Sequence, residues 1–185
     1  MKKILLSLLV LSFLTGCRNS DNSLERGLAL REKMLQSGCC FLAEITADYG
    51  DRTFSFQMQC NADVEGNLSF TVQKPESISG ITGTIGAAGG KLTFDNTVLA
   101  FSMMADGEIS PVSCPWILIR TLQSGYVASS VRESEGIHLT VHDSYEEDAL
   151  LLDIWLDSNE LPKYAEVLWQ GRRILSIRVD NFAFV

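Results

Sequence analysis

Hydrophobic and polar residues alternate along most of the chain with the period of two that is typical of half-buried strands. Residues 41–49 have apolar side chains at odd positions, whereas residues 54–60 have them at even positions. Short apolar runs continue to the C-terminus at intervals of about 8–12 residues, among them 98–104. The sequence predicts about eleven strands in one antiparallel sheet, barrel or sandwich, with a hairpin turn at Gln170–Gly171.

Two stretches have a helical spacing instead. Residues 23–36 form the first, with Asn22 and Glu25 placed for a capping box and Gly38 as a stop signal. The spacing is set by Leu24, Leu28, Leu30, Arg31, Met34 and Leu35. Residues 111–125 form the second, which we predict as a short buried helix, or as a strand if its β-branched residues prevail. The fold class is therefore mainly β with two helices.

The first two strands predict a register for their hairpin. Apolar faces of paired strands must lie on the same side of the sheet, because directly opposed residues share a face. A two-residue turn at Tyr49–Gly50 satisfies this condition. It places Asp48 opposite Asp51 and Ile45 opposite Phe54. A shift of two residues, with the turn at Gly50–Asp51, satisfies it equally.

Four cysteines follow the N-terminal region. The first register places Cys39 opposite Cys60, and we predict a Cys39–Cys60 disulfide; the shifted register makes them diagonal neighbours. Cys40 and Cys114 stay free or pair with each other. No Cys-x-x-Cys or Cys-x-x-His spacing is present, so no metal site is expected.

The N-terminus has the pattern of an export signal. Two lysines precede an apolar run, Ile4–Leu14, that is too short to cross a hydrocarbon core of ~30 Å. Its end, Leu-Thr-Gly-Cys, resembles a bacterial lipobox, in which Cys17 receives acyl chains such as palmitate and the chain is cut before it. We expect a signal peptide at 1–16, a tether at 17–22 and a single domain at 23–185. The alternative is a plain signal peptide that happens to end near a cysteine.

Composition and charge narrow the function classes. The chain has 185 residues, 46% of them hydrophobic, which excludes a disordered protein. Its 23 acidic and 15 basic residues give a formal net charge of −8, which argues against a nucleic-acid partner. Loss of Lys2 and Lys3 with the signal peptide would lower this charge further.

Four segments carry a family resemblance. Residues 66–76 (Gly-Asn-Leu-Ser-Phe-Thr-Val-Gln-Lys-Pro-Glu) and 89–95 (Gly-Gly-Lys-Leu-Thr-Phe-Asp) resemble a strand and a hairpin of the LolA/LolB-like lipoprotein carrier superfamily. Residues 111–122 fall where its plug helix would be, and 165–179 resemble its final hairpin. The resemblance implies an antiparallel half-barrel with an N-terminal helix and an inserted plug helix. It extends to germination lipoproteins of spore-forming bacteria, which are similar in fold.

The resemblance also implies a binding cavity. Large apolar side chains would face the concave side of a curled sheet and could line a cavity for a lipid or lipoprotein acyl chain. These residues are Phe54, Phe56, Met58, Phe70, Phe94, Phe101, Trp116 and Leu118. The alternative is that they fill the core. The arginine with which the soluble carrier holds its helix has no clear counterpart here; only Arg52 lies in the first hairpin.

Candidate catalytic residues are few. His138 and His142 share the polar face of one strand, about 13 Å apart, which is too far for one metal ion and favours a solvated outer face. The acidic segment 146–148 is best interpreted as a turn, and Asp153 and Asp157 have no evident partner. No catalytic or cofactor-binding motif is present. We therefore expect no enzyme and no cofactor.

The sequence thus predicts a lipid-anchored lipoprotein on the extracytoplasmic face of a membrane in the cell envelope. Its half-barrel would bind an apolar ligand, a lipid or a lipoprotein acyl chain. The alternative is a non-enzymatic interaction or regulatory lipoprotein with a filled core, for which the protein partner is not specified by the sequence.

Overall fold

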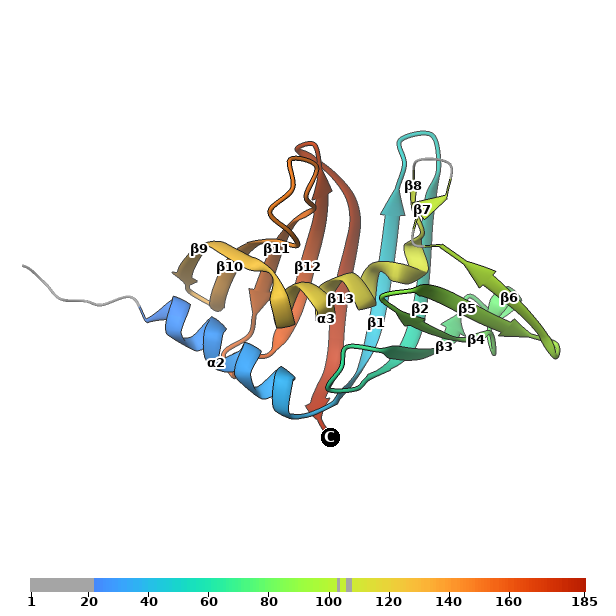
Figure 1. Cartoon of the computed structure of the whole chain (residues 1–185), viewed down its shortest axis with the longest axis horizontal. Coiled ribbons are helices and arrows are strands. Elements are labelled where there is room, and N and C mark those ends of the chain that lie inside the picture. The colour runs from blue at the N-terminus through green and yellow to red at the C-terminus, as the bar shows by residue number, and fades with distance from the viewer. Residues whose placement is uncertain (1–21, 103, 106–107) are drawn as a thin grey trace, which may run out of the picture.

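The computed structural model describes residues 22–102, 104–105 and 108–185. The predicted signal peptide at 1–16, the acylated Cys17 and the tether up to residue 21 lie outside the described residues. The remaining chain forms the curved sheet and two helices shown in Figure 1.

Eleven strands form one open antiparallel sheet, as predicted. They are β1 (Cys39–Asp48), β2 (Thr53–Ala62), β3 (Leu68–Lys74), β4 (Thr82–Gly86), β5 (Gly89–Phe94), β6 (Thr97–Phe101), β9 (Tyr126–Glu133), β10 (Gly136–His142), β11 (Leu151–Leu156), β12 (Pro162–Trp169) and β13 (Arg172–Phe184). Their order is β6-β5-β4-β3-β2-β1-β13-β12-β11-β10-β9, so the C-terminal strand joins two meanders. The sheet does not close, and β6 and β9 are its edges.

The run 98–104, predicted as one strand, is divided in two. Its first part belongs to β6, and its end forms β7 (Met104–Ala105), which pairs with β8 (Glu108–Ile109) in a separate two-stranded sheet. A 3-10 turn, η1 (Glu76–Ile78), precedes β4.

The N-terminal helix, α2 (Ser23–Gln36), spans the predicted residues. It packs Ser23, Gly27, Leu30 and Met34 against the rest of the molecule. The predicted capping box is wrong, because the Asn22 side chain makes no cap hydrogen bond. Its Oδ1 instead accepts a hydrogen bond from Arg26 Nε at 3.2 Å.

The second predicted helix is also present. A 3-10 turn, η2 (Pro111–Ser113), leads into α3 (Cys114–Ser124), which lies across the concave side of the sheet (Figure 1). Nine of its eleven residues are buried. A helix that is apolar on nearly all sides is stable only when it is enclosed, here between the sheet and α2.

The hairpin of β1 and β2 has the shifted register, so the predicted pairing of Cys39 with Cys60 is wrong. Phe41 pairs with Cys60, and Cys39 pairs with Ala62. The chain turns at Gly50–Asp51, as in the shifted alternative: Tyr49 N–H donates to Arg52 O at 3.0 Å, and the backbone N–H of Gly50 donates to Asp48 Oδ1 at 2.9 Å. Both cysteines are free thiols in the structure, so the predicted disulfide is absent from it.

Candidate functional site

The centre of the concave face is packed. Met58 of β2 has no exposed surface, and Leu118 of α3 has 1% of its surface exposed. Such side chains adjoin no space large enough for a water molecule, because that space would count as accessible surface. Around these two side chains, the described part of the region beneath α3 is therefore closely packed.

The eight residues predicted to line a cavity fall into two groups. Five of them are buried in this core: Phe56, Met58, Phe70, Trp116 and Leu118. Phe101 is half-buried against it, whereas Phe54 and Phe94 are about half exposed, at 46% and 54%. The predicted set thus spans both a packed centre and an open margin of the same concave face.

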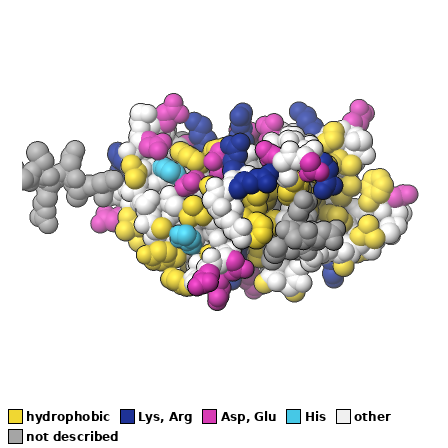
Figure 2. Space-filling model, turned by 90° about the horizontal axis from the view of Figure 1, so that it is seen from above, with side chains coloured by type: hydrophobic (Ala, Val, Ile, Leu, Met, Phe, Trp, Pro, Cys, Tyr) yellow, Lys and Arg dark blue, Asp and Glu magenta, His cyan; other side chains and the backbone are white. Residues whose placement is uncertain are grey.

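The open margin lies on β4, β5 and β6, which we call the wing. A rung of paired residues runs outward from buried Phe70 through Leu92 to Leu99, which is 59% exposed. Paired residues share a face, so Leu92 and Leu99 continue the inner face of the half-barrel. Figure 2 shows hydrophobic side chains at the surface of this end of the molecule. An apolar surface thus extends from the core to the edge of the sheet.

Glycines flatten the inner face of the wing. A Cβ atom built on Gly90 would lie 2.2 Å from Phe101 Cζ, and one on Gly83 would lie 2.5 Å from Phe70 Cζ. Each aromatic ring therefore lies on the backbone of a glycine in the neighbouring strand. Any larger residue at either position would push the ring away.

The two faces of the wing differ in chemistry. The outer face has a hollow lined mainly by hydroxyl side chains and Lys91, with a volume of about 580 Å³. The inner face carries Leu92, Phe94, Leu99 and Phe101. Within 82–102 the charged residues are Lys91 and Asp95, so the inner face has no charge of its own.

Arg31 connects the two helices. Its guanidinium, on α2, donates hydrogen bonds to carbonyl groups at the C-terminal end of α3, and burial lowers its pKa. This arginine ties the plug helix down from α2, a role for which the sequence offered only Arg52. Arg31 was predicted only as part of the helical spacing, since a contact across about ninety residues leaves no local signal.

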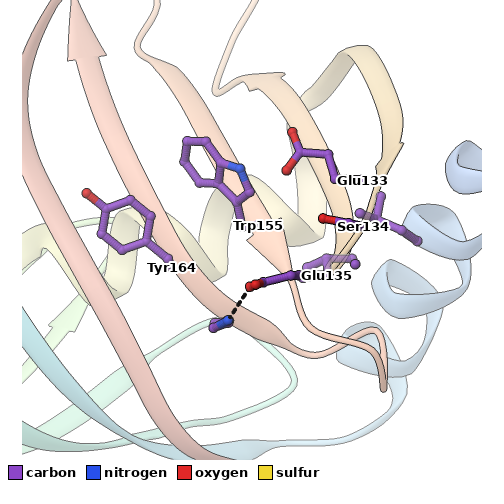
Figure 3. Close-up of a pocket in the computed structure, with 9 residues that line it drawn as sticks. Glu133, Ser134, Glu135, Trp155 and Tyr164 are labelled. Atoms are coloured by element: carbon purple, nitrogen blue, oxygen red, sulfur yellow. Dashed lines mark hydrogen bonds and ion pairs between the residues drawn. The ribbon is translucent and has the colours of Figure 1, made fainter.

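A second site, which is polar, lies at the end of the sheet opposite the wing (Figure 3). Glu133, Ser134 and Glu135 lie on one side of a pocket of about 270 Å³, and Trp155 and Tyr164 on the other. Lys163 closes its rim with an ion pair to Glu135, at 3.3 Å between Nζ and Oε2.

Beside this pocket, Asp153 has two partners that the sequence did not predict. Its Oδ1 lies 3.1 Å from His138 Nε2 and accepts a hydrogen bond from Thr140 at 2.8 Å. His138 is half-buried and stacks on Trp155 with ring centroids 4.4 Å apart. The hydroxyl and the imidazole both bind the carboxylate, so the imidazole is not placed to remove a proton from Thr140.

Three of the four described thiols, those of Cys39, Cys60 and Cys114, are buried. Burial raises the pKa of Cys39 to about 12, with a smaller effect of Cys40. Burial also raises the pKa of Cys114 and of Cys60, where Cys114 and Cys39 add to the rise. Protonated thiols are poor nucleophiles and poor metal ligands.

Two further features bear on function: the length of the helices and the grouping of side chains that could bind a metal ion. Neither helix in the described part of the chain is long and apolar enough to cross a membrane. In the same residues, no three His, Cys, Asp or Glu side chains gather as ligands for a metal ion.

The sequence matches no protein-family model and no curated protein sequence. Similar solved structures are known. A conserved protein of unassigned function from Thermus thermophilus is 14% identical, with 88% of each chain covered and a TM-score of 0.49. An outer membrane lipoprotein-sorting protein domain from Vibrio parahaemolyticus is 11% identical, covering 90% of this chain and 93% of that domain with a TM-score of 0.47.

A LolA superfamily protein from Nitrosomonas europaea is 10% identical, with 86% of this chain and 93% of that chain covered and a TM-score of 0.45.

Proposed function

We propose that this protein is a membrane-anchored extracytoplasmic lipoprotein without catalytic function, which binds an apolar ligand on the inner face of its wing. The ligand class is an acyl chain, of a lipid or of a lipoprotein. The observation that carries the proposal is the uncharged apolar surface that runs outward from buried Phe70 to exposed Leu99. Covering such a surface is favourable by about 25 cal/mol per Å² of apolar area.

The wing is a better candidate than the centre of the half-barrel. A ligand beneath α3 would have to displace side chains such as Met58 and Leu118, which have almost no accessible surface. A ligand on the wing needs no such displacement. It would lie along Leu92, Phe94, Leu99 and Phe101 and leave the core intact.

The anchor rests on the lipobox-like sequence that ends at Cys17. Several acyl chains on one cysteine give stable attachment to a bilayer, whereas one chain gives marginal binding. Replacing Cys17 by serine should move the protein from the membrane fraction to the soluble fraction. Retention of the Cys17→Ser protein in washed membranes would contradict the anchor.

Native mass spectrometry tests the ligand. The Cys17→Ser protein, expressed with its signal peptide so that it passes through its own envelope, should carry co-purified lipid. Organic extraction followed by mass spectrometry would identify the lipid. Protein that is free of lipid, and that takes up none from added phospholipid, would contradict acyl-chain binding.

A second candidate function is supported by the edge strand. In the described residues no strand pairs with the free side of β6, whose sequence Thr-Val-Leu-Ala-Phe contains neither charge nor proline. Edges of this kind are suited to strand addition by an extended peptide. With a filled core, the protein would then be an interaction or regulatory lipoprotein, and Ala100→Pro would weaken peptide binding without weakening lipid binding.

A further inference from the structure

The N-terminal helix has a second apolar stripe, beside the one that it buries. Leu24, Leu28 and Leu35 are 45%, 44% and 53% exposed. At 100° per residue these three leucines fall within an arc of about 40°, so they form one line along α2. The stripe is therefore an apolar line on the helix that follows the predicted lipid anchor, with Arg31 between Leu28 and Leu35.

Arg31 and a pair of tyrosines adjoin the stripe. Arg31 lies on the same side of α2, and its guanidinium bonds the carbonyl of Gly125, the residue before Tyr126. The rings of Tyr126 and Tyr145 lie 5.5 Å apart, and their side chains are 49% and 88% exposed. Leucines beside exposed tyrosines are typical of surfaces that enter the boundary between lipid headgroups and acyl chains.

We propose that this face of the molecule lies on the bilayer that holds the lipid anchor. The inference rests on the proposed anchor at Cys17. Five residues separate Cys17 from Ser23, the first residue of α2, and six residue steps span at most about 20 Å. The stripe begins one residue later, at Leu24, so α2 is the described element that the anchor holds nearest to the membrane.

The contact rests on apolar side chains and not on charge. The whole chain has a formal net charge of −8, which anionic headgroups would repel. The α2 sequence has a net charge of +1, because Arg26, Arg31 and Lys33 outnumber Glu25 and Glu32. Arg26 is however paired with Glu160, and Tyr145 lies in the acidic segment 143–148. The wing lies at the other end of the long axis (Figure 1), so docking through α2 leaves β6 uncovered by this contact.

A fluorophore on α2 tests the docking. Lipidated protein carrying Cys40→Ser and Leu28→Cys is labelled with NBD and incorporated into vesicles of phosphatidylcholine and phosphatidylglycerol. The matched control carries Ala29→Cys, an exposed position more than a quarter-turn away on the same helix. We expect a blue shift, a rise in intensity and quenching by doxyl-labelled lipid at position 28 but not at position 29. Adding Leu24→Gln and Leu35→Gln should remove the effect at position 28.

The possible outcomes separate the two proposals. Intact mass spectrometry shows first whether Cys17 is acylated; a chain without acyl groups overturns the anchor and, with it, the docking. A lipidated protein whose label at position 28 responds no more than the label at position 29 overturns the docking alone and leaves the anchor standing. A response confined to position 28, lost in the leucine variants, supports both.

Discussion

Arg31 of α2 and Gly125 at the end of α3 are joined by a hydrogen bond, with Nη2 2.6 Å from the carbonyl oxygen. The Nε group of the same side chain donates to Leu122 O at 2.8 Å. The last four carbonyl groups of a helix have no partner within it. Arg31 thus satisfies carbonyl groups that α3 leaves open and attaches the plug helix to α2.

Replacing Arg31 by methionine should loosen α3. The variant keeps an unbranched apolar stem but loses both hydrogen bonds, and bonds to a charged donor are worth about 2 kcal/mol. We expect a decrease of this order in the free energy of unfolding in urea and faster amide exchange at 121–125. Arg120→Met, at an exposed position of α3, is the control and should leave both quantities unchanged. Equal unfolding midpoints for the two variants would show that Arg31 does not hold the helix.

Two threonines should respond in opposite ways to the same substitution. Thr121 is 2% exposed and its hydroxyl has no hydrogen-bond partner among the described residues, whereas the Thr140 hydroxyl donates to Asp153. Valine has nearly the same shape as threonine. We therefore expect Thr121→Val to raise the free energy of unfolding by about 1 kcal/mol and Thr140→Val to lower it by a similar amount. Thermal and urea unfolding measure both, and a destabilised Thr121→Val protein would refute the unpaired hydroxyl.

Asp63 should make stability depend on pH. Partial burial raises the pKa of its carboxyl group, but hydrogen bonds from the Asn67 side chain and from the backbone N–H groups of Asn67, Glu65 and Gly66 outweigh this effect and lower it overall. The carboxylate therefore stabilises the fold above the unfolded pKa of about 3.9, and this contribution is lost as pH falls through the lowered folded value.

Asp63→Ala should accordingly lower the free energy of unfolding by at most about 1 kcal/mol near pH 7, because solvent screens an exposed carboxylate. The difference from wild type should shrink below about pH 4. Urea unfolding at several pH values measures it, with Glu65→Ala as the control. A difference that stays constant with pH would mean that the turn at 63–67 does not depend on the charge.

The thiols should differ in reactivity. Cys40 is half-buried, whereas Cys39, Cys60 and Cys114 are buried. Iodoacetamide should therefore modify Cys40 first in the folded protein and should modify all four thiols in denaturant without a reductant. Peptide mapping reports both results. A Cys39–Cys60 peptide linked in unreduced material would show that these diagonal neighbours do form a disulfide.

Local patterns predicted much of this fold. The helical spacing at 23–36 gives the observed α2, and Gln170–Gly171 forms the predicted turn, with both residues at positive φ. The register of β1 and β2 was missed by two residues. The Tyr49 hydroxyl donates a hydrogen bond to Ile109 O, and its ring packs on Phe54. The contact with Ile109, sixty residues away, favours the turn at Gly50–Asp51 and leaves no local sign in the sequence.

The sequence also did not predict which part of the candidate site is buried and which part is exposed. Phe70 of β3 and Phe94 of β5 lie on the same face of the sheet, yet one is buried and the other is 54% exposed. The difference depends on how far α3 reaches across the sheet, which is a property of the assembled fold. Periodicity identifies the inner face but does not show which part of it is covered.

Leu99 and Val98 allow a direct test of the proposed ligand site, because they are adjacent on β6, 59% and 61% exposed, and point to opposite faces of the sheet. The Cys17→Ser protein, freed of lipid, is titrated with a fluorescent fatty acid. Leu99→Gln, on the inner face, should weaken binding about tenfold, the effect of losing one buried leucine contact, whereas Val98→Gln should leave the Kd unchanged. Absence of binding, or equal effects of the two substitutions, would contradict acyl-chain binding on the inner face of the wing.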